Sequence, residues 1–159
     1  MDWHAVFSWI EASALSTWVR ESPSMLGFPA IIAAHAIGMG LLVGACAAMD
    51  LRLLGFAPRI PLSSTDALMP VIHIGFWVNA ISGVALFVGD ATTKGTTWVF
   101  MTKLGIIAVG VILLLALKRT VYGRGEASAI ETPTSRALAA ASLALWFLAI
   151  VTGRYMAYV

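Results

Sequence analysis

Three ionisable residues lie inside otherwise apolar stretches of this sequence: His35, Lys103 and Arg154. An ionisable side chain at membrane depth is expensive, and such residues usually face a bundle interior, a water-filled cavity or a binding site. Imidazole is a common metal ligand, and two basic side chains near it favour an anionic guest. The residue types therefore point to a bound cofactor with a metal or anionic groups.

Helical rise gives an approximate depth for each candidate. Counted from the outer membrane boundary at about 1.5 Å per residue, His35 lies roughly 12 Å deep, Lys103 roughly 8 Å and Arg154 roughly 6 Å. Ser82 comes to about the level of His35. One site in the outer half could thus receive a side chain from each of four helices. Haem b would suit such a site, with neutral His35 on the iron and Lys103 and Arg154 on the propionates.

The same residues also have other interpretations. Lys103 and Arg154 are shallow enough for their charged ends to reach the outer lipid headgroups, which needs no cofactor. His35 could be hydrogen-bonded to a neighbouring helix. A quinone headgroup or an anionic lipid is compatible with the same basic residues. The sequence leaves these alternatives open.

His73 is a second candidate iron ligand, because two histidines on adjacent helices suggest bis-histidine ligation. It lies about 16 residues from the outer end of its helix, roughly 24 Å deep and roughly 12 Å below His35. One iron atom cannot reach both imidazoles. A haem on His35 would then take another sixth ligand, such as Met101 or Met156, or none, and His73 is expected to be a helix-contact residue.

A different pattern indicates copper. Imidazole, thioether and thiol are the ligands that Cu(I) prefers, and they recur along one face of the first apolar segment and at the start of the second. A methionine stripe is more often a packing feature, so packing in an apolar core is the commoner explanation of the pattern. The residues concerned are His35, Met39, Cys46, Met49, Met69 and His73.

Four apolar segments must position these side chains. Of the 159 residues 60% are hydrophobic and 11% charged, and the mean hydropathy is +0.89, as in integral membrane proteins. Each segment is about one bilayer thick. The sequence predicts an all-α, integral membrane four-helix bundle within 27–159. The expected helices are 27–49, 68–89, 98–117 and 137–158, with connections at 50–67, 90–97 and 118–136.

Several classes of function are not expected. The net charge is +2 and the basic residues are scattered, so no nucleic-acid partner is indicated. There is no HExxH, CxxC, phosphate loop or Ser/His/Asp arrangement, which argues against hydrolytic or nucleotide chemistry. A lone Cys46 cannot form an internal disulfide.

The distribution of basic residues predicts the orientation. The first and third connections hold six basic residues, whereas the N-terminal segment and the second connection hold two. The positive-inside rule then places both termini outside, which for a bacterial inner membrane is the periplasm. The six are Arg52, Arg59, Lys118, Arg119, Arg124 and Arg136, and the two are Arg20 and Lys94.

Residues 1–21 are predicted to form an amphipathic helix that lies in the outer membrane interface. The segment has no basic n-region and is interrupted by Glu11 and Arg20, so a cleaved signal peptide is not expected. Contact with a partner subunit is the competing interpretation of its apolar face. That face contains Trp3, Val6, Phe7, Ile10, Ala14 and Trp18.

Small residues in three of the segments predict close helix packing. Gly40-Leu41-Leu42-Val43-Gly44 is a small-xxx-small motif of the kind that lets helices approach. The pattern supports a compact bundle or an oligomer equally. The others are Gly38, Ala45, Gly75, Gly83, Gly105 and Gly110.

The order of several short motifs adds a family resemblance. Asp50-Leu51-Arg52-Leu53-Leu54-Gly55 after a helix with His35, then Lys103, then Gly153-Arg154-Tyr155, resemble an uncharacterised bacterial family of four-helix membrane proteins, domain-of-unknown-function family 6644. The resemblance implies a compact four-helix protein with His35, Lys103 and Arg154 at family positions, and it implies no activity. Where family members often carry a histidine at the inner end of the third helix, this chain has Leu117-Lys118.

The leading hypothesis is therefore a membrane subunit that binds haem b in its outer half and takes part in electron transfer with another membrane or periplasmic subunit. The architecture also resembles small b-type cytochromes and copper-resistance membrane proteins. The main alternative is an accessory subunit of a larger complex without a cofactor. Binding of copper, a quinone or a lipid is a third possibility.

Overall fold

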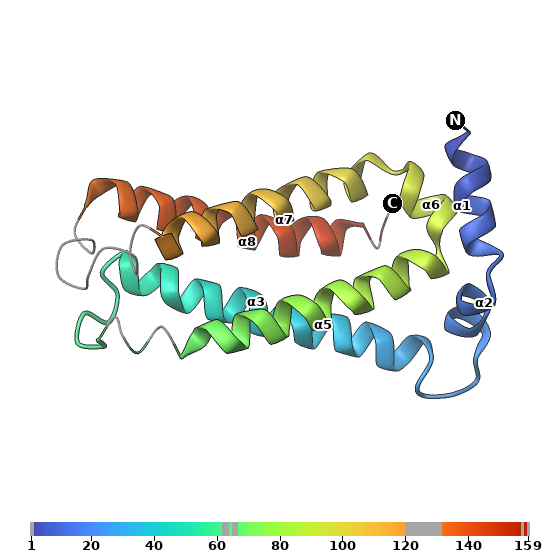
Figure 1. Cartoon of the computed structure of the whole chain (residues 1–159), viewed down its shortest axis with the longest axis horizontal. Coiled ribbons are helices and arrows are strands. Elements are labelled where there is room, and N and C mark those ends of the chain that lie inside the picture. Colours follow the sequence, from blue (N-terminus) through green and yellow to red (C-terminus); the bar gives the residue numbers. More distant parts are fainter. Residues whose placement is uncertain (1, 62–63, 65–66, 120–131, 157, 159) are drawn as a thin grey trace.

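All the regular secondary structure in the part that the structure describes is helical (Figure 1). The structure is a computed structural model and describes residues 2–61, 64, 67–119, 132–156 and 158. Four of its helices are long and apolar enough to cross a membrane. The prediction of an all-α four-helix membrane bundle is confirmed.

The membrane-spanning helices are α3, α5, α7 and α8. Two of them match the expected boundaries, α5 at Leu68–Gly89 and α7 at Trp98–Leu117. α8 covers Pro133–Tyr155 and begins four residues earlier than expected, because Thr132 caps it: the Thr132 hydroxyl accepts from the Ser135 amide at 3.2 Å.

α3 covers Phe28–Leu53, so the expected start of a connection at Asp50 is wrong. The helix continues for one more turn because Leu53 packs in an apolar cluster with Leu117 and Ala139. Arg52 points the other way and donates to the carbonyls of Ile60 (2.6 Å) and Pro58 (3.3 Å). Asp50 therefore lies inside the bundle.

The four long helices form two antiparallel pairs, α3 with α5 and α7 with α8, and the pairs meet where α3 packs on α8 (Figure 1). We call the end covered by α1, α2 and α6 the cap end and the opposite end the loop end. Both chain termini lie at the cap end. The main core cluster fills the α3–α5–α8 contact and contains Leu42, Ala45, Cys46, Met49, Ile72 and Trp146.

α3 and α5 approach each other at two glycines that face across the pair. A Cβ atom on Gly38 would lie 2.6 Å from the backbone nitrogen of Asn79, and one on Gly75 would lie 2.6 Å from that of Leu42. Gly40 and Gly44, which form the small-xxx-small motif, have no such neighbour within 4 Å. The close contact between α3 and α5 therefore involves Gly38 and Gly75, and not the two glycines of the small-xxx-small motif.

The N-terminal segment consists of two helices instead of the expected one. α1 covers Trp3–Glu11 and α2 covers Ala14–Glu21, and the Ser13 hydroxyl caps α2 by accepting from the Ser16 amide at 3.3 Å. Both helices run across the cap end, roughly perpendicular to the bundle (Figure 1). The expected apolar face is divided: Phe7 packs against Gly95, while Trp3 is exposed.

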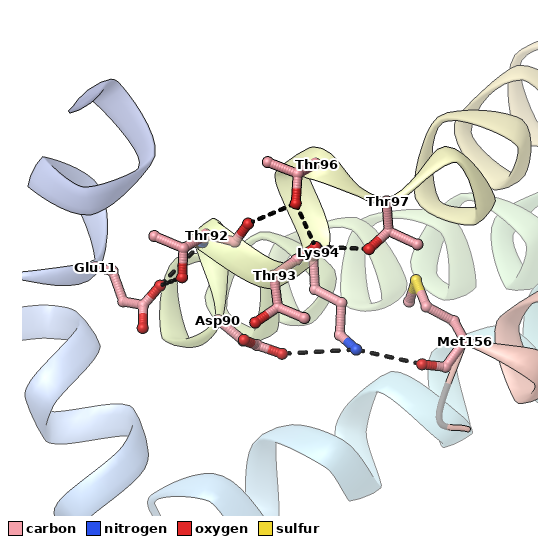
Figure 2. A network of polar contacts seen from close by, with 8 residues as sticks. All are labelled: Glu11, Asp90, Thr92, Thr93, Lys94, Thr96, Thr97 and Met156. Carbon is pink, nitrogen blue, oxygen red and sulfur yellow. Dashed lines mark hydrogen bonds and ion pairs between the residues drawn. The ribbon is translucent and has the colours of Figure 1, made fainter. Parts of the chain in front are cut away.

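A single carboxylate joins α1 to the short helix α6, which covers Ala91–Thr96 and was not expected from the sequence. Glu11 accepts from the Thr92 amide at 2.9 Å and from its hydroxyl, and it pairs with Arg20 of α2 at 2.9 Å. Figure 2 shows this contact and, beyond it, Lys94 between the carboxylate of Asp90 (3.5 Å) and the carbonyl of Met156 (3.2 Å). The polar contacts thus hold α1, α2, α6 and the end of α8 together.

We expect Glu11→Gln to loosen α1 from the bundle. The Thr92 hydroxyl and amide, followed by Arg20, hold the pKa of Glu11 below its ordinary value of 4.5. A lowered folded-state pKa stabilises the docked form above pH 4.5, and this stabilisation is lost as the pH falls through the folded-state pKa. Hydrogen exchange of residues 3–21 should be several-fold faster in Glu11→Gln at neutral pH, and acid should reproduce the change in the unmodified protein.

Glu21→Gln is the matched control, because Glu21 is exposed at the end of α2. It should leave the exchange of residues 3–21 unchanged. Equal exchange in Glu11→Gln and the unmodified protein at neutral pH would show that the apolar contacts alone dock α1.

Candidate functional site

His35 is held against α5 by polar contacts with two residues. Its Nδ1 lies 3.0 Å from the carbonyl oxygen of Asn79 and 3.2 Å from the hydroxyl of Ser82. The Asn79 side chain in turn donates to the carbonyl oxygen of His35 at 2.9 Å. Gly83 leaves room for the ring, since a Cβ there would lie 3.1 Å from Cε1 of His35. The prediction that His35 and Ser82 share a level of the bundle agrees with this geometry.

These contacts determine which ring nitrogen is available. A backbone carbonyl only accepts hydrogen bonds, so Nδ1 of His35 carries the proton and donates to Asn79. In the neutral imidazole Nε2 then has a free lone pair, and no described residue bonds to it. A backbone carbonyl on Nδ1 is the usual support of a histidine that ligates a metal through Nε2.

Lys103 is buried in the same part of the bundle. Its side chain comes from α7 and is only 7% exposed. The Nζ atom lies 3.3 Å from the position that a Cβ on Gly153 of α8 would occupy, and Met39 of α3 reaches the same place. Its ammonium group lies in the neighbourhood of the imidazole of His35. No described residue pairs with this ammonium group, which is costly for a buried charge and favours an anionic partner from outside the chain.

Arg154 does not lie with His35 and Lys103. Its side chain is exposed, and the guanidinium lies 5.6 Å from the centroid of the Tyr158 ring. Gly153, the residue before it, is the part of α8 that contacts Lys103. The arrangement fits the interpretation in which Arg154 extends toward the headgroup region.

His73 lies on the surface of α5, away from His35. Its Nδ1 bonds to the carbonyl oxygen of Met69 on its own helix at 2.7 Å. His73 is nine residues from Ser82, or about 13 Å along the helix axis. The two imidazoles are thus separated as the depth estimate predicted, and the hydrogen bond described for the exposed His73 is to its own helix.

The two methionines proposed as sixth ligands lie at the surface of α7 and at the end of α8. Met101 is 53% exposed on the outside of α7. Met156 forms the end of α8, where its carbonyl accepts from Lys94. Of the axial ligands considered, only His35 therefore remains at this site, and the methionine that approaches the site is Met39, beside Lys103.

The copper interpretation gains no support from the geometry. Cys46 and Met49 are buried in the main apolar core, and Cys46 is 11 residues, about 16 Å, along α3 from His35. One copper ion cannot bind both. In the parts of the chain that are described, no three His, Cys, Asp or Glu side chains are placed to hold a metal ion.

Two residues of the site were not found by sequence reasoning. Asn79 is the main partner of His35, and Gly153 makes the space for Lys103. An asparagine inside an apolar segment was a usable signal, because amides in membrane helices hydrogen-bond across helices. Gly153 was noted only as part of a motif, and its role depends on the α7–α8 contact.

Two side chains of this group have the chemistry that haem b uses in its binding sites. Nε2 of His35 can serve as an axial ligand, and the unpaired ammonium group of Lys103 can neutralise a propionate. The Nδ1 hydrogen bond to Asn79 supplies the support that such ligands have in other proteins. The fit rests on these two side chains, with Arg154 at the surface.

Comparison of the chain with known protein families, curated proteins and solved structures finds no match. The resemblance to domain-of-unknown-function family 6644 therefore stays a prediction, and the function has to be argued from the site itself.

Proposed function

We propose that this chain is a small membrane subunit that binds haem b in the half of the bundle nearer the cap end and takes part in electron transfer. In this proposal the cap end faces the periplasm of a bacterial inner membrane. The electron partner is another membrane or periplasmic protein. The single observation that carries the proposal is the free Nε2 of His35, with Nδ1 fixed by Asn79.

Three residues of the chain would orient and bind the cofactor at this site. The Asn79 carbonyl keeps the proton of His35 on Nδ1 and orients the ring. Ser82 offers a second acceptor to the same N–H at 3.2 Å. Lys103 supplies a positive charge in a poorly hydrated place, where a carboxylate pairs with it strongly. Haem b, when bound, would supply the one-electron chemistry that no side chain here provides.

The decisive experiment is an absorption spectrum of the detergent-purified protein, oxidised and dithionite-reduced, with a pyridine haemochrome assay. The protein should be expressed with ample haem supply. A reduced α-band with about one haem per chain would support the proposal. Absence of haem under these conditions would overturn it.

Lys103 is a buried lysine near the axial ligand, so replacing it should lower the affinity for haem. We expect Lys103→Gln to weaken haem binding by roughly tenfold to a hundredfold, because a hydrogen bond to a charged group is worth about 1.5–3 kcal/mol. Haem titration of the apoprotein would measure this change. Lys94→Gln at the cap end is the control and should bind haem normally, since Lys94 contacts Asp90 and Met156 instead. Equal affinity in the two variants would remove Lys103 from the site.

The accessory-subunit hypothesis is the second candidate, and the surface of α1 favours it. Trp9 is 77% exposed and Trp3 is 61% exposed, so α1 presents indole rings on the side away from the bundle. Tryptophan is enriched both at protein interfaces and at the membrane interface. A haem-free protein in the experiment above would make this the leading hypothesis.

A further inference from the structure

A second polar group lies between α3 and α8, toward the loop end. Four buried side-chain polar atoms in the described part of the chain have no hydrogen-bond partner, and three of them are here. They are Oδ2 of Asp50, Oγ of Ser142 and Nε1 of Trp146. Asp50 is 15 residues, about 22 Å, along α3 from His35, so this group is separate from the site described above.

The carboxylate of Asp50 and the hydroxyl of Ser142 face each other across the helix contact. Asp50 is 2% exposed and Ser142 is 1% exposed. The hydroxyl is close enough to act on the carboxylate, although neither atom meets hydrogen-bond geometry. Trp146 is one turn further along the same face of α8, within the main core cluster. Buried polar atoms in proteins are normally bonded to protein or to ordered water, so the three orphaned atoms mark a place for water.

Among the residues that the structure describes, no cation pairs with Asp50. On α3 the nearest titratable group is the thiol of Cys46, one turn away, and Arg52 is bound to loop carbonyls instead. Lys103 of α7 and Arg154 of α8 lie toward the cap end, and the titratable groups of the neighbouring helices that are described nearer the level of Asp50 are exposed. They are Arg136 on α8, Lys118 at the end of α7 and His73 on α5.

An unpaired carboxylate in this setting needs a proton or a metal cation. Hard cations take about six or more oxygen ligands, whereas this place offers one carboxyl group, one hydroxyl and an indole N–H that repels a cation. A proton needs only one carboxylate oxygen. The chemistry of the group therefore favours a proton.

We propose that the Asp50 carboxyl group is a proton-binding site that exchanges its proton with water at the loop end, with Ser142 beside it as hydrogen-bond partner. The apolar cluster of Leu53, Leu117 and Ala139 lies between it and that end, since Leu53 and Ala139 are each one turn nearer the loop end than Asp50 and Ser142. Asp50 is only three residues, about 4.5 Å, from the end of α3. Transient entry of water past this cluster is enough for exchange. The inference does not depend on haem binding.

Infrared difference spectroscopy of the whole protein in liposomes tests this proposal. Lowering the pH from about 9 to about 5, a range above the ordinary aspartate pKa of about 3.9, should produce the C=O stretch of a neutral carboxyl group. Asp50→Asn should abolish that signal, and Ser142→Ala should displace its midpoint, because the carboxyl group loses its nearest hydroxyl. Asp90→Asn, at the exposed cap end, is the control and should leave the signal unchanged.

Each other outcome would overturn the proposal. Absence of the signal at all pH values would show a permanently ionised carboxylate, and a signal that never titrates would show a carboxyl group closed to water. Suppression of the signal by sodium chloride, but not by choline chloride, would show a cation site. If Asp50→Asn does not insert into the membrane, the unmodified protein is labelled with a carbodiimide instead. Mass spectrometry then locates the adduct and assigns the signal to Asp50 or to another residue.

Discussion

His35→Ala is expected to abolish the haem absorption bands while the chain remains inserted in the membrane. The variant removes the imidazole that Asn79 orients as the axial ligand, and Lys103 by itself provides no bond to the iron. Haem content should therefore fall from about one per chain to near zero. Absorption spectra and a haemochrome assay on equal amounts of purified protein measure the change.

His73→Ala is the matched control, because it removes an imidazole from the same bundle. Its ring bonds only to the carbonyl of Met69 on its own helix, so the spectrum should be unchanged. Glycine at position 35 with added imidazole offers a further check, since free imidazole can replace the missing ligand and restore the bands. Unchanged absorbance in His35→Ala would end the assignment of His35, and loss of the bands in His73→Ala would move the site.

Gly38→Ala and Gly75→Ala are expected to destabilise the bundle by about 1–3 kcal/mol each, the usual cost of overpacking. The added methyl group would lie 2.6 Å from backbone nitrogen in both cases, and backbone cannot move aside as a flexible side chain can. Separation of α3 from α5 would also lengthen the contact between His35 and Asn79. Thermal unfolding in detergent measures the stability, and haem affinity reports on the site.

Gly40→Ala and Gly44→Ala are controls on the same helix. Neither position has a neighbour within 4 Å, so the methyl group meets no protein atom. Alanine is a better helix former than glycine by about 1 kcal/mol, and these variants should be unchanged or slightly more stable. A large loss of stability at Gly40 or Gly44 would show that these glycines contact another copy of the chain or another subunit.

Hydrophobic length was sufficient to predict the bundle. α5 and α7 begin and end where the apolar segments do, because lipid leaves an unbonded backbone no alternative to a helix. The presence of His35 and Lys103 in an interior group could also be expected, since ionisable side chains avoid lipid. Lys103 is buried and His35 is partly buried against α5.

The boundaries that were wrong depend on side-chain contacts between distant segments. Asp50 resembled the start of a connection because a charged residue usually leaves the membrane. Only the packing of Leu53 against Leu117 and Ala139 shows that α3 continues and carries the carboxylate inward. The break between α1 and α2 depends on Ser13, whose capping role was not considered.

The sequence by itself determined the helical class, the four spans and the level of His35, because these follow from hydrophobic length and a fixed rise per residue. Only the tertiary structure decided which partners each polar side chain has. In the folded chain His35 contacts Asn79 and Lys103 lies against Gly153. Arg154 lies at the surface, and Asp50 is buried opposite Ser142. These results depend on the rotation of each helix about its own axis. The spans are apolar on nearly every face, so their sequence does not specify that rotation, which is set by close contacts such as Gly38 with α5.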